Sequence, residues 1–337
     1  MREYRLTDGE DERRLELRDA AEPRAGAGEL VVRMRAQSLN YRDLIVLGGG
    51  YPRNDRPGVV PLSDGAGEIA GVGAGVEGWA VGDRVAINFM RDWHGGEVDD
   101  RALDSSFGGG VDGVLADLVA VPAGAVARIP DWMGFAEAAT LPCAGVTAWH
   151  GLRRAGVTAG DTVLLLGTGG VSVFGLQLAQ AMGARTIVTS SSDDKLARAR
   201  AMGAAVGINY RTRPDWDAAA REATGGRGVD AVIEVGGPGT LARSIAATRT
   251  GGSIALIGLL TDDPPPALTP VLLNALTVHG IYVGSTAMLR ELIAAVDLHR
   301  IRPVVDRRFA FEDAAGAYDY FRRQEHVGKV VITDERD

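Results

Sequence analysis

The chain has a single cysteine, Cys143, among its 337 residues. One cysteine cannot form an internal disulfide bond or a multi-cysteine zinc cluster, and this usage is typical of a reducing compartment. Long basic runs are absent as well, and the formal net charge is −8. Nothing in this composition attracts the phosphate backbone of a nucleic acid, so we expect no nucleic-acid partner.

The sequence also lacks the segments that direct a chain to a membrane or out of the cell. Acidic residues soon follow Met1, where a secretory signal would place an apolar core. The uncharged segment Thr162–Ala184 is long enough to span a bilayer, but a glycine turn divides it into a strand-length piece and a helix-length piece. We interpret it as the core of an α/β domain and expect a cytoplasmic protein without membrane contact.

Composition is that of a globular protein, with 46% hydrophobic and 24% charged residues. The length predicts two domains, because a single hydrophobic core stops growing near about 250–300 residues. The first part contains short β-rich runs separated by glycine and proline: Leu30–Met34, Gly67–Gly73, Asp83–Ile87 and Val114–Val121. They predict a mostly antiparallel β domain, with a long loop from Asn88 to Val111.

From about Thr162 the pattern changes to strands that alternate with helices. We expect strands at Thr162–Leu166, Thr186–Ser190, Val206–Asn209, Asp230–Val235, Ser253–Gly258 and Thr277–Val283. We expect helices at Val171–Met182, Asp194–Met202, Trp216–Thr224 and Gly239–Ala247. This alternation predicts a doubly wound parallel sheet. The remaining elements expected are helices at Ala287–His299 and Phe311–Gln324 and a strand at Lys329–Thr333.

A glycine turn follows the first of these strands directly: Gly167, Thr168, Gly169, Gly170, Val171 and Ser172. Glycines at such a turn allow a pyrophosphate to approach the free N–H groups at the start of the next helix. Ser172 stands where a third glycine is usual. With a strand before it and a helix after it, the turn predicts a Rossmann domain that binds a dinucleotide cofactor.

The end of the second strand indicates which dinucleotide. NAD sites usually have an acidic residue there, but this chain has Ser190, Ser191 and Ser192, whose hydroxyls can donate to a 2′-phosphate. Lys195 adds positive charge nearby, which favours NADP. Two neighbouring acids, Asp193 and Asp194, would weaken such a site if they pointed inward, and the serines could instead be only a polar loop.

Several short segments together resemble the medium-chain dehydrogenase/reductase superfamily over nearly the whole length. They are Ser38–Asp43, Ser63–Glu68, Gly82–Val85, Ala138–Cys143, Gly167–Ser172 and Gly328–Val331. The resemblance implies an α/β protein with three segments: a β-rich catalytic domain at 1–140, a coenzyme domain at 141–284 and a tail at 285–337 that returns to the catalytic domain. It also implies an active site in the cleft between the domains.

Zinc enzymes of this superfamily hold a catalytic metal through a Cys, a His-Glu pair and often a second Cys. This chain has Asn40 at the position of the first Cys and Ser63-Asp64 at the position of the His-Glu pair. Only Cys143, at the position of the second Cys, matches a metal ligand. A zinc site needs three good protein ligands, so no zinc is expected. The Asn40-Tyr41-Arg42-Asp43 run and Tyr51-Pro52 resemble the zinc-free quinone oxidoreductase branch, whose members reduce quinones or activated C=C bonds with NADPH. Tyr210 matches a tyrosine that flanks the adenosine phosphate in that branch.

Without a metal, the electrophile needs hydrogen-bond donors for the charge that develops on its oxygen. Asn40, Tyr41 and Tyr51 are the candidate donors, and we expect Asp64 and Cys143 to line the pocket; Tyr41 could instead be a packing residue and Cys143 a small buried side chain. Ligands bind beyond the carboxyl ends of parallel strands. Contacts to the nicotinamide half are therefore expected from Thr147, Val235, Gly236, Gly258, Leu259, Val283 and Gly284.

Three functions fit these residues. The main hypothesis is an NADPH-dependent reductase of α,β-unsaturated carbonyls or quinones that acts on a small molecule. The alternatives are a metal-independent alcohol dehydrogenase or ketone reductase, and a non-catalytic NADPH-binding sensor or structural protein. The uncharged stretch Pro264–Leu289 builds subunit interfaces through edge strands in relatives, so the resemblance implies a homodimer.

Overall fold

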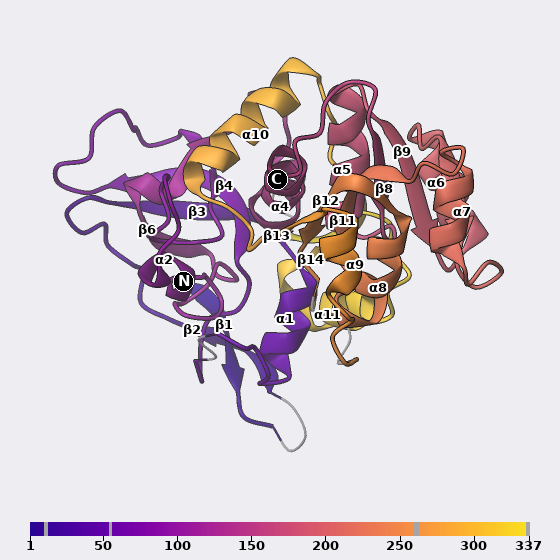
Figure 1. Cartoon of the computed structure of the whole chain (residues 1–337). Coiled ribbons are helices and arrows are strands. Elements are labelled where there is room, and N and C mark those ends of the chain that lie inside the picture. The colour runs from indigo at the N-terminus through magenta and orange to yellow at the C-terminus, as the bar shows by residue number, and fades with distance from the viewer. Residues whose placement is uncertain (10–12, 54–55, 259, 261–262, 335–337) are drawn as a thin grey trace. The chain divides into compact units, whose positions relative to one another are not determined.

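The computed structural model describes residues 1–9, 13–53, 56–258, 260 and 263–334. The chain divides into two compact units, one of Met1–Val146 with Val283–Asp337 and one of Thr147–Tyr282 (Figure 1). The first unit therefore contains both the start and the end of the chain, and the second is a single continuous segment. Each has its own sheet.

The second unit is built on a parallel sheet of six strands in the order β10-β9-β8-β11-β12-β13. Its strands are β8 (Thr162–Leu165), β9 (Arg185–Ser190), β10 (Val206–Asn209), β11 (Val229–Glu234), β12 (Thr248–Leu256) and β13 (Thr277–Gly280). This order confirms the predicted doubly wound sheet. Strand order reverses between β8 and β11, which is where such sheets bind their ligands, beyond the carboxyl ends of the strands. Strand β12 begins at Thr248 instead of the predicted Ser253, and β13 ends at Gly280 instead of Val283.

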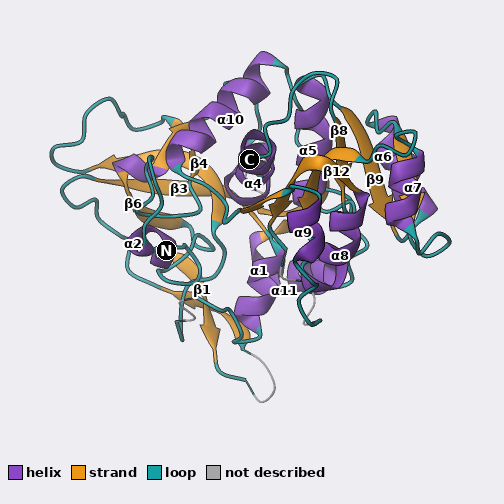
Figure 2. Cartoon of the chain, viewed as in Figure 1, coloured by secondary structure: helices purple, strands orange, loops and turns teal. Residues whose placement is uncertain are grey.

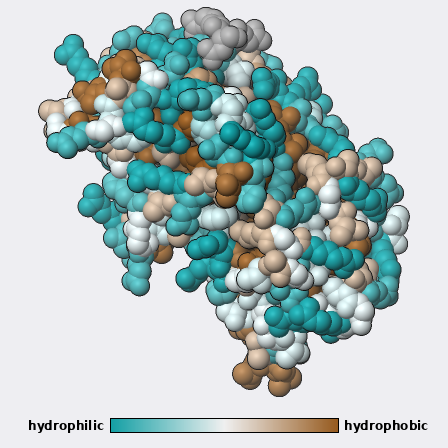
Figure 3. Space-filling model, turned by 90° about the horizontal axis from the view of Figure 1, so that it is seen from above, coloured by the Kyte–Doolittle hydropathy of each residue, from teal (hydrophilic) through white to brown (hydrophobic). Residues whose placement is uncertain are grey.

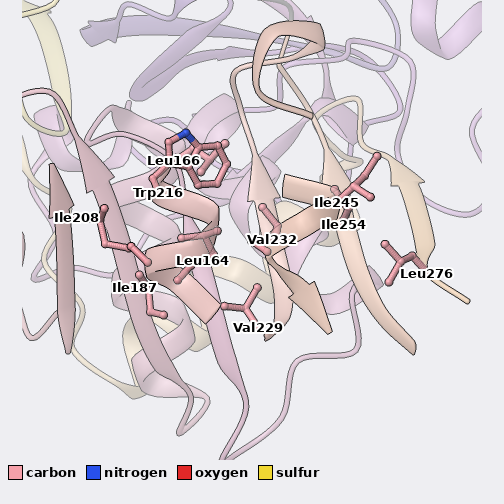
Figure 4. Close-up of a cluster of buried hydrophobic side chains, with 13 residues drawn as sticks. Leu164, Leu166, Ile187, Ile208, Trp216, Val229, Val232, Ile245, Ile254 and Leu276 are labelled. Carbon is pink, nitrogen blue, oxygen red and sulfur yellow. The ribbon is translucent and has the colours of Figure 1, made fainter. Parts of the chain in front are cut away.

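Side chains alternate between the two faces of this sheet, as strand geometry requires. Leu164, Ile187, Val232 and Ile254 form one row across four strands and face a buried cluster that includes Trp216 (Figure 4). The opposite face packs closely as well, since a Cβ added at Gly175 would lie only 2.7 Å from Leu165 Cδ2. The helices of this unit are α4 (Val146–Arg154, which begins at the boundary), α5 (Gly170–Ala181), α6 (Asp193–Ala201), α7 (Trp216–Glu222), α8 (Pro238–Ala247) and α9 (Thr269–Leu273).

The row of apolar side chains gives a direct stability prediction. Ile254 has no exposed surface, so we expect Ile254→Ala to lower the free energy of unfolding by about 3 kcal/mol through lost burial and the cavity left behind. Ile254→Val removes one methylene and is expected to cost about 1 kcal/mol. Urea unfolding of the two variants measures both values. Equal losses for Ala and Val would contradict the tight packing described for this site.

The first unit has a mostly antiparallel sheet in the order β14-β15-β3-β4-β5-β7, with β6 paired to β3, and a separate β1-β2 hairpin. Strands β1, β3, β4 and β6 of this unit are labelled in Figure 2, where all strands are orange. Only β14 and β15 pair in parallel in it. Its strands are β1 (Arg2–Thr7), β2 (Arg14–Asp19), β3 (Glu29–Ser38), β4 (Asp64–Val72), β5 (Arg84–Ile87), β6 (Leu118–Pro122), β7 (Val126–Arg128), β14 (Val305–Ala310) and β15 (Lys329–Thr333). Together with the second unit, this confirms the predicted fold class.

Short helical elements connect these strands. They are α1 (Tyr41–Leu47), α2 (Asp100–Asp104), α3 (Phe135–Ala138), a π-helix (Leu141–Gly145), α10 (Thr286–Leu298), α11 (Ala314–Arg322) and the 3₁₀ turns Ala123–Ala125 and Phe311–Asp313. The predicted strand at Val114–Val121 was wrong in its first half. There Val114 and Leu115 donate to the backbone oxygens of Leu62 and Pro61 in a connecting segment, so they do not join the ladder. The predicted loop Asn88–Val111 contains α2, which periodicity did not indicate.

No helix in the described part of the chain is long and apolar enough to cross a membrane. The uncharged segment Thr162–Ala184 consists of β8 and α5 with the glycine turn between them, as predicted. On the face shown in Figure 3, hydrophobic residues lie in small separate groups among hydrophilic ones.

Candidate functional site

The glycine turn connects the buried strand β8 to helix α5 in the second unit. Gly167 has a φ of 74°, a left-handed conformation that glycine adopts without strain. Gly169 precedes the helix, and no side chain caps the helix there. The first N–H groups of α5 are therefore free of side-chain partners and suit the pyrophosphate of a dinucleotide.

Ser172 explains how this turn works without a third glycine. Its side chain is buried, and its hydroxyl donates to the backbone oxygen of Leu166 at 2.6 Å. Thr189 of β9 accepts a hydrogen bond from Gly167 N at 3.2 Å. These two side chains hold the turn in place.

The residues predicted to hold a 2′-phosphate lie near the carboxyl ends of β9 and β10. Ser190 ends β9, and its backbone oxygen accepts from Tyr210 N at 3.0 Å. Ser192 is the N-cap of α6 and accepts from Lys195 N at 3.4 Å. Tyr210 is 42% exposed, which leaves its ring accessible. Ser190, Ser192, Lys195 and Tyr210 are therefore brought together, with Ser191 between the two serines.

One of the opposing acids has a partner on the protein. Asp193 accepts a hydrogen bond from the side-chain amide of Asn209 at 3.0 Å. Both Asp193 and Asp194 are exposed. Because Asp193 accepts this hydrogen bond and is exposed to solvent, its negative charge repels a neighbouring phosphate less strongly.

The residues predicted to contact the nicotinamide half fall in both units. Val235, Gly236 and Gly258 follow β11 and β12, and a Cβ at Gly258 would lie 1.9 Å from the oxygen of Val235, so only glycine fits there. Thr147 is buried in α4 of the same unit. Val283 and Gly284 belong to the first unit, where Val283 has an unusual φ of 53°. Leu259 lies outside the described residues.

Glu234 at the end of β11 was not among the predicted site residues. It has no exposed surface and accepts hydrogen bonds from Gly236 N at 2.7 Å, Gly237 N at 3.0 Å and the Thr240 hydroxyl at 2.6 Å. The hydroxyl of Ser244 donates to its other oxygen. Glu234 thus fixes the turn after β11. An acidic residue at the end of an apolar strand is the sequence feature that could have identified it.

In the first unit, Asn40 and Tyr41 stand at the start of α1. The carboxylate of Asp43 accepts a hydrogen bond from Asn40 N at 2.7 Å, which ties the first turn of the helix to the chain before it. The Tyr41 ring is half-buried, and its hydroxyl has no hydrogen-bond partner in the described part of the chain. Tyr51, another predicted donor, is buried and its ring packs on the Arg42 guanidinium at 4.5 Å.

Asp64 begins strand β4 and is completely buried. Its Oδ1 accepts from the Ser63 hydroxyl at 2.7 Å, and its Oδ2 accepts from Cys143 N at 3.1 Å. Cys143 is partly exposed and lies in the π-helix, an element that often occurs at functional sites. Leu62, which directly precedes Ser63 and Asp64, has a φ of 67°. Such backbone strain in a buried non-glycine residue is also typical of functional sites.

Lys329 joins these groups from the last strand. It begins β15, is buried, and its ammonium group donates to the backbone oxygen of Leu39 and to Asn40 Oδ1. Burial lowers the pKa of Lys329, and the charge of Asp64 opposes that shift. Burial raises the pKa of Asp64, while the Lys329 charge and the Asn40 amide oppose it. Burial and the charge of Asp64 raise the pKa of Cys143.

The structure thus brings together Asn40, Asp64 and Cys143, three of the residues expected at the site, and adds Lys329, which the sequence analysis did not select. The sequence feature that could have identified Lys329 is its positive charge inside the otherwise apolar segment Val327–Ile332. A lysine at a buried strand position needs polar partners, and its presence there indicates a polar cluster underneath.

The neighbouring Asp43 predicts a pH dependence of stability. Burial raises its pKa to about 6, although the Arg42 and Lys329 cations oppose the shift and Asp64 adds to it. The native state therefore keeps a proton that the unfolded chain loses near pH 4, so this group's contribution to stability falls as pH rises from 4 to 6. Between pH 4.5 and 7 we expect the wild type to lose about 2 kcal/mol relative to Asp43→Asn in urea unfolding. A constant difference between the two proteins would contradict the buried proton.

The donor set at this position does not suit a catalytic zinc ion. It offers one carboxylate and one thiol, together with an amide and an ammonium cation, whereas zinc needs three Cys, His or carboxylate ligands. The residues that the structure describes contain no group of three His, Cys, Asp or Glu side chains placed to hold a metal ion. We therefore derive no chemistry from a metal at this site.

Comparisons with known proteins agree with these two units. The model of the alcohol dehydrogenase GroES-like domain matches residues 26–131, and that of the zinc-binding dehydrogenase family matches residues 170–297. A zinc-type alcohol dehydrogenase-like protein of Schizosaccharomyces pombe is 45% identical over 90% of both chains. An acryloyl-coenzyme A reductase of Metallosphaera sedula is 30% identical over 94% of this chain and 96% of its own.

Solved structures show the same relationship. A putative alcohol dehydrogenase from Sinorhizobium meliloti 1021 is 39% identical and superposes with a TM-score of 0.91 over 98% of each chain. The two domain models, the full-length relatives and the shared fold thus agree on the family of this chain. This chain belongs to the medium-chain dehydrogenase/reductase superfamily and is an oxidoreductase of a family that binds a nicotinamide cofactor.

Proposed function

We propose that this enzyme reduces the C=C bond of α,β-unsaturated carbonyl compounds or quinones with NADPH and without a metal. The observation that carries the proposal is the cluster of Asn40, Asp64, Cys143 and Lys329, whose groups cannot complete a metal site. By the family resemblance, the first three of these residues stand where zinc relatives have metal ligands. The relative named acryloyl-coenzyme A reductase acts, by its name, on a conjugated C=C bond, which supports the same reaction class here.

A conjugated acceptor can be reduced by hydrogen-bonding groups alone. A nicotinamide cofactor, when bound, would supply a hydride to the β-carbon of the substrate. The π electrons of the C=C bond would then form a double bond between the α-carbon and the carbonyl carbon, and those of the C=O bond would move onto the oxygen. The resulting enolate must take up a proton at the α-carbon, as the C=O bond re-forms, to give the saturated product. The protein has to stabilise that oxygen with donors and deliver the proton.

Tyr41 is the best-placed donor in the first unit. Its hydroxyl has no hydrogen-bond partner among the described residues, and its ring is only half-buried, so it can donate to a substrate oxygen. Cys143 is partly exposed and lines the same cluster, but its raised pKa keeps it a neutral thiol. Asn40 and Asp64 are buried and act by holding the segments that carry Tyr41 and Cys143.

The cofactor residues follow from the second unit. The first turn of α5, from Gly169 and Gly170 through Val171, would hold the pyrophosphate, with Thr168 in the turn. Ser190, Ser191 and Ser192 would donate to the 2′-phosphate, with the charge of Lys195 and the ring of Tyr210 beside it. For the nicotinamide half, the expected contacts in the second unit are those of Thr147, Val235, Gly236 and Gly258.

Product analysis tests the reaction class. The purified protein is incubated with NADPH and a small enone, and the products are separated by gas chromatography. We expect the saturated ketone. The allylic alcohol would instead support a metal-independent alcohol dehydrogenase or ketone reductase, which the names of several relatives favour. Tight NADPH binding without oxidation across enones, quinones and aldehydes would indicate a non-catalytic binding protein.

We also infer a homodimer formed through the β13 edge of the second unit. Strand β13 ends the sheet in this unit, and the adjoining α9 region exposes three leucines, Leu268, Leu272 and Leu273, by 70%, 78% and 76%. Open strand edges and clustered exposed leucines are typical of subunit interfaces. We expect a dimer mass in light scattering for the wild type and a monomer mass for Leu272→Glu with Leu273→Glu. A monomeric wild type would contradict the inference.

A further inference from the structure

We propose that Lys329 is the positioning residue of the cluster: its ammonium group is a built-in cation that fixes the Asn40 amide and balances the buried carboxylate of Asp64. The positive charge that a metal ion brings to this position in zinc relatives then comes from the chain itself. The proposal concerns the site of the proposed reductase, and it rests on that function only for its kinetic measurement.

Lys329 is held in place by the sheet of the first unit. Lys329 stands at the first residue of β15, which pairs with β3 at Val331 and Ser38, so its backbone is fixed by the sheet. From there its ammonium group reaches the backbone oxygen of Leu39 and Asn40 Oδ1, directly before α1. With its oxygen bonded to Lys329, the Asn40 amide is oriented, and its buried Nδ2 is kept as a donor near the Asp64 carboxylate, whose ionised form it favours.

The charges of Lys329 and Asp64 also stabilise each other. Asp64 and Lys329 are both buried, and a buried charge is very unfavourable without a compensating one. The charge of Lys329 stabilises ionised Asp64, and that of Asp64 stabilises protonated Lys329. Asp64 in turn accepts from Cys143 N, so the cation on β15 is coupled through Asp64 to the π-helix.

This arrangement also explains why the donor set did not suit zinc. The charge of Lys329 favours the ionised form of Asp64 and would repel a divalent cation brought to that carboxylate. This chain thus has the ammonium group of Lys329 at its polar cluster, although the family model and one relative that it matches are named for zinc.

Alkylation of Cys143 tests the charge balance without any assay of activity. Cys143 is the only cysteine, so iodoacetamide labelling of the intact chain, followed by mass spectrometry, reports on this cluster alone. The thiolate is the reactive form, and its formation is opposed by Asp64 and assisted by Lys329. At pH 9 we expect Lys329→Met to react about threefold more slowly than wild type and Asp64→Asn about threefold faster.

Two further variants separate charge from loosened packing. Lys329→Arg keeps the cation and should retain the wild-type rate. The double variant Lys329→Met with Asp64→Asn removes both charges and should return close to that rate. Faster labelling of every variant, or no difference between them, would overturn the proposal. If Lys329→Met is insoluble, acceleration in Asp64→Asn and its reversal in the double variant decide the question.

The kinetic measurement shows whether the cation also serves catalysis. For Lys329→Met we expect kcat for an enone to fall about tenfold with the KM for NADPH unchanged, and Lys329→Arg to restore most of the loss. An unchanged kcat, or a loss that appears in the KM for NADPH, would contradict a positioning role. If the wild type turns over no enone, the proposed function fails, and the opposite signs of the two labelling rates still test the role of Lys329.

Discussion

Replacement of Tyr41 by Phe is expected to lower kcat for an enone by about 100-fold while leaving the KM for NADPH unchanged. Loss of one donor to a developing oxyanion typically costs about 100-fold to 1,000-fold in rate. The Tyr41 hydroxyl has no partner in the described part of the protein, so its removal breaks no internal hydrogen bond. Steady-state kinetics with a small enone and saturating NADPH measure the effect.

Tyr318→Phe is the matched control. Tyr318 lies in α11 of the same unit, and its hydroxyl is completely buried and also without a partner. It loses the same oxygen atom where no substrate can reach, so kcat should stay within about twofold of wild type. If Tyr41→Phe retains full kcat with an unchanged melting temperature, Tyr41 is a packing residue and the donor must be sought elsewhere.

The features that could be predicted from the sequence are those specified by local patterns. A buried apolar strand, a glycine turn and an apolar helix follow one another between Thr162 and Met182, so the strand, the turn and the helix were all predicted within one or two residues. Likewise, the alternation of strands and helices up to β12 determines the parallel sheet. Each helix crosses over between two parallel strands of the same sheet, and such crossovers are almost always right-handed. The substrate side of the enzyme has no comparable local signal.

The polar cluster of the first unit could be predicted only in part. Asn40, Asp64 and Cys143 were identified through the segments that carry a resemblance, but their partner Lys329 is 289 residues from Asn40 in sequence and meets it only through the pairing of β15 with β3. No periodicity encodes that contact. The capping role of Asp43 is more local, since an acid three residues after Asn40 at a helix start is a recognisable pattern.

The largest change in cofactor use is expected from Ser192→Asp. Ser192 caps α6, and aspartate is an equally good N-cap, so the helix should remain intact while a negative charge is placed at the proposed 2′-phosphate position. A charge-assisted hydrogen bond contributes about 1.5–3 kcal/mol, and its replacement by repulsion should lower kcat/KM for NADPH by about 100-fold. NADH should lose little, because a carboxylate can accept from the ribose 2′-OH.

Ser192→Asn is the control that separates charge from capping. Asparagine caps as well as aspartate but is neutral, so its ratio of kcat/KM for NADPH to that for NADH should stay within about fivefold of wild type. If the aspartate and asparagine variants behave alike, the serines are a polar loop and the preference lies elsewhere. If the wild type itself uses NADH as well as NADPH, Lys195 and Tyr210 do not form a phosphate site.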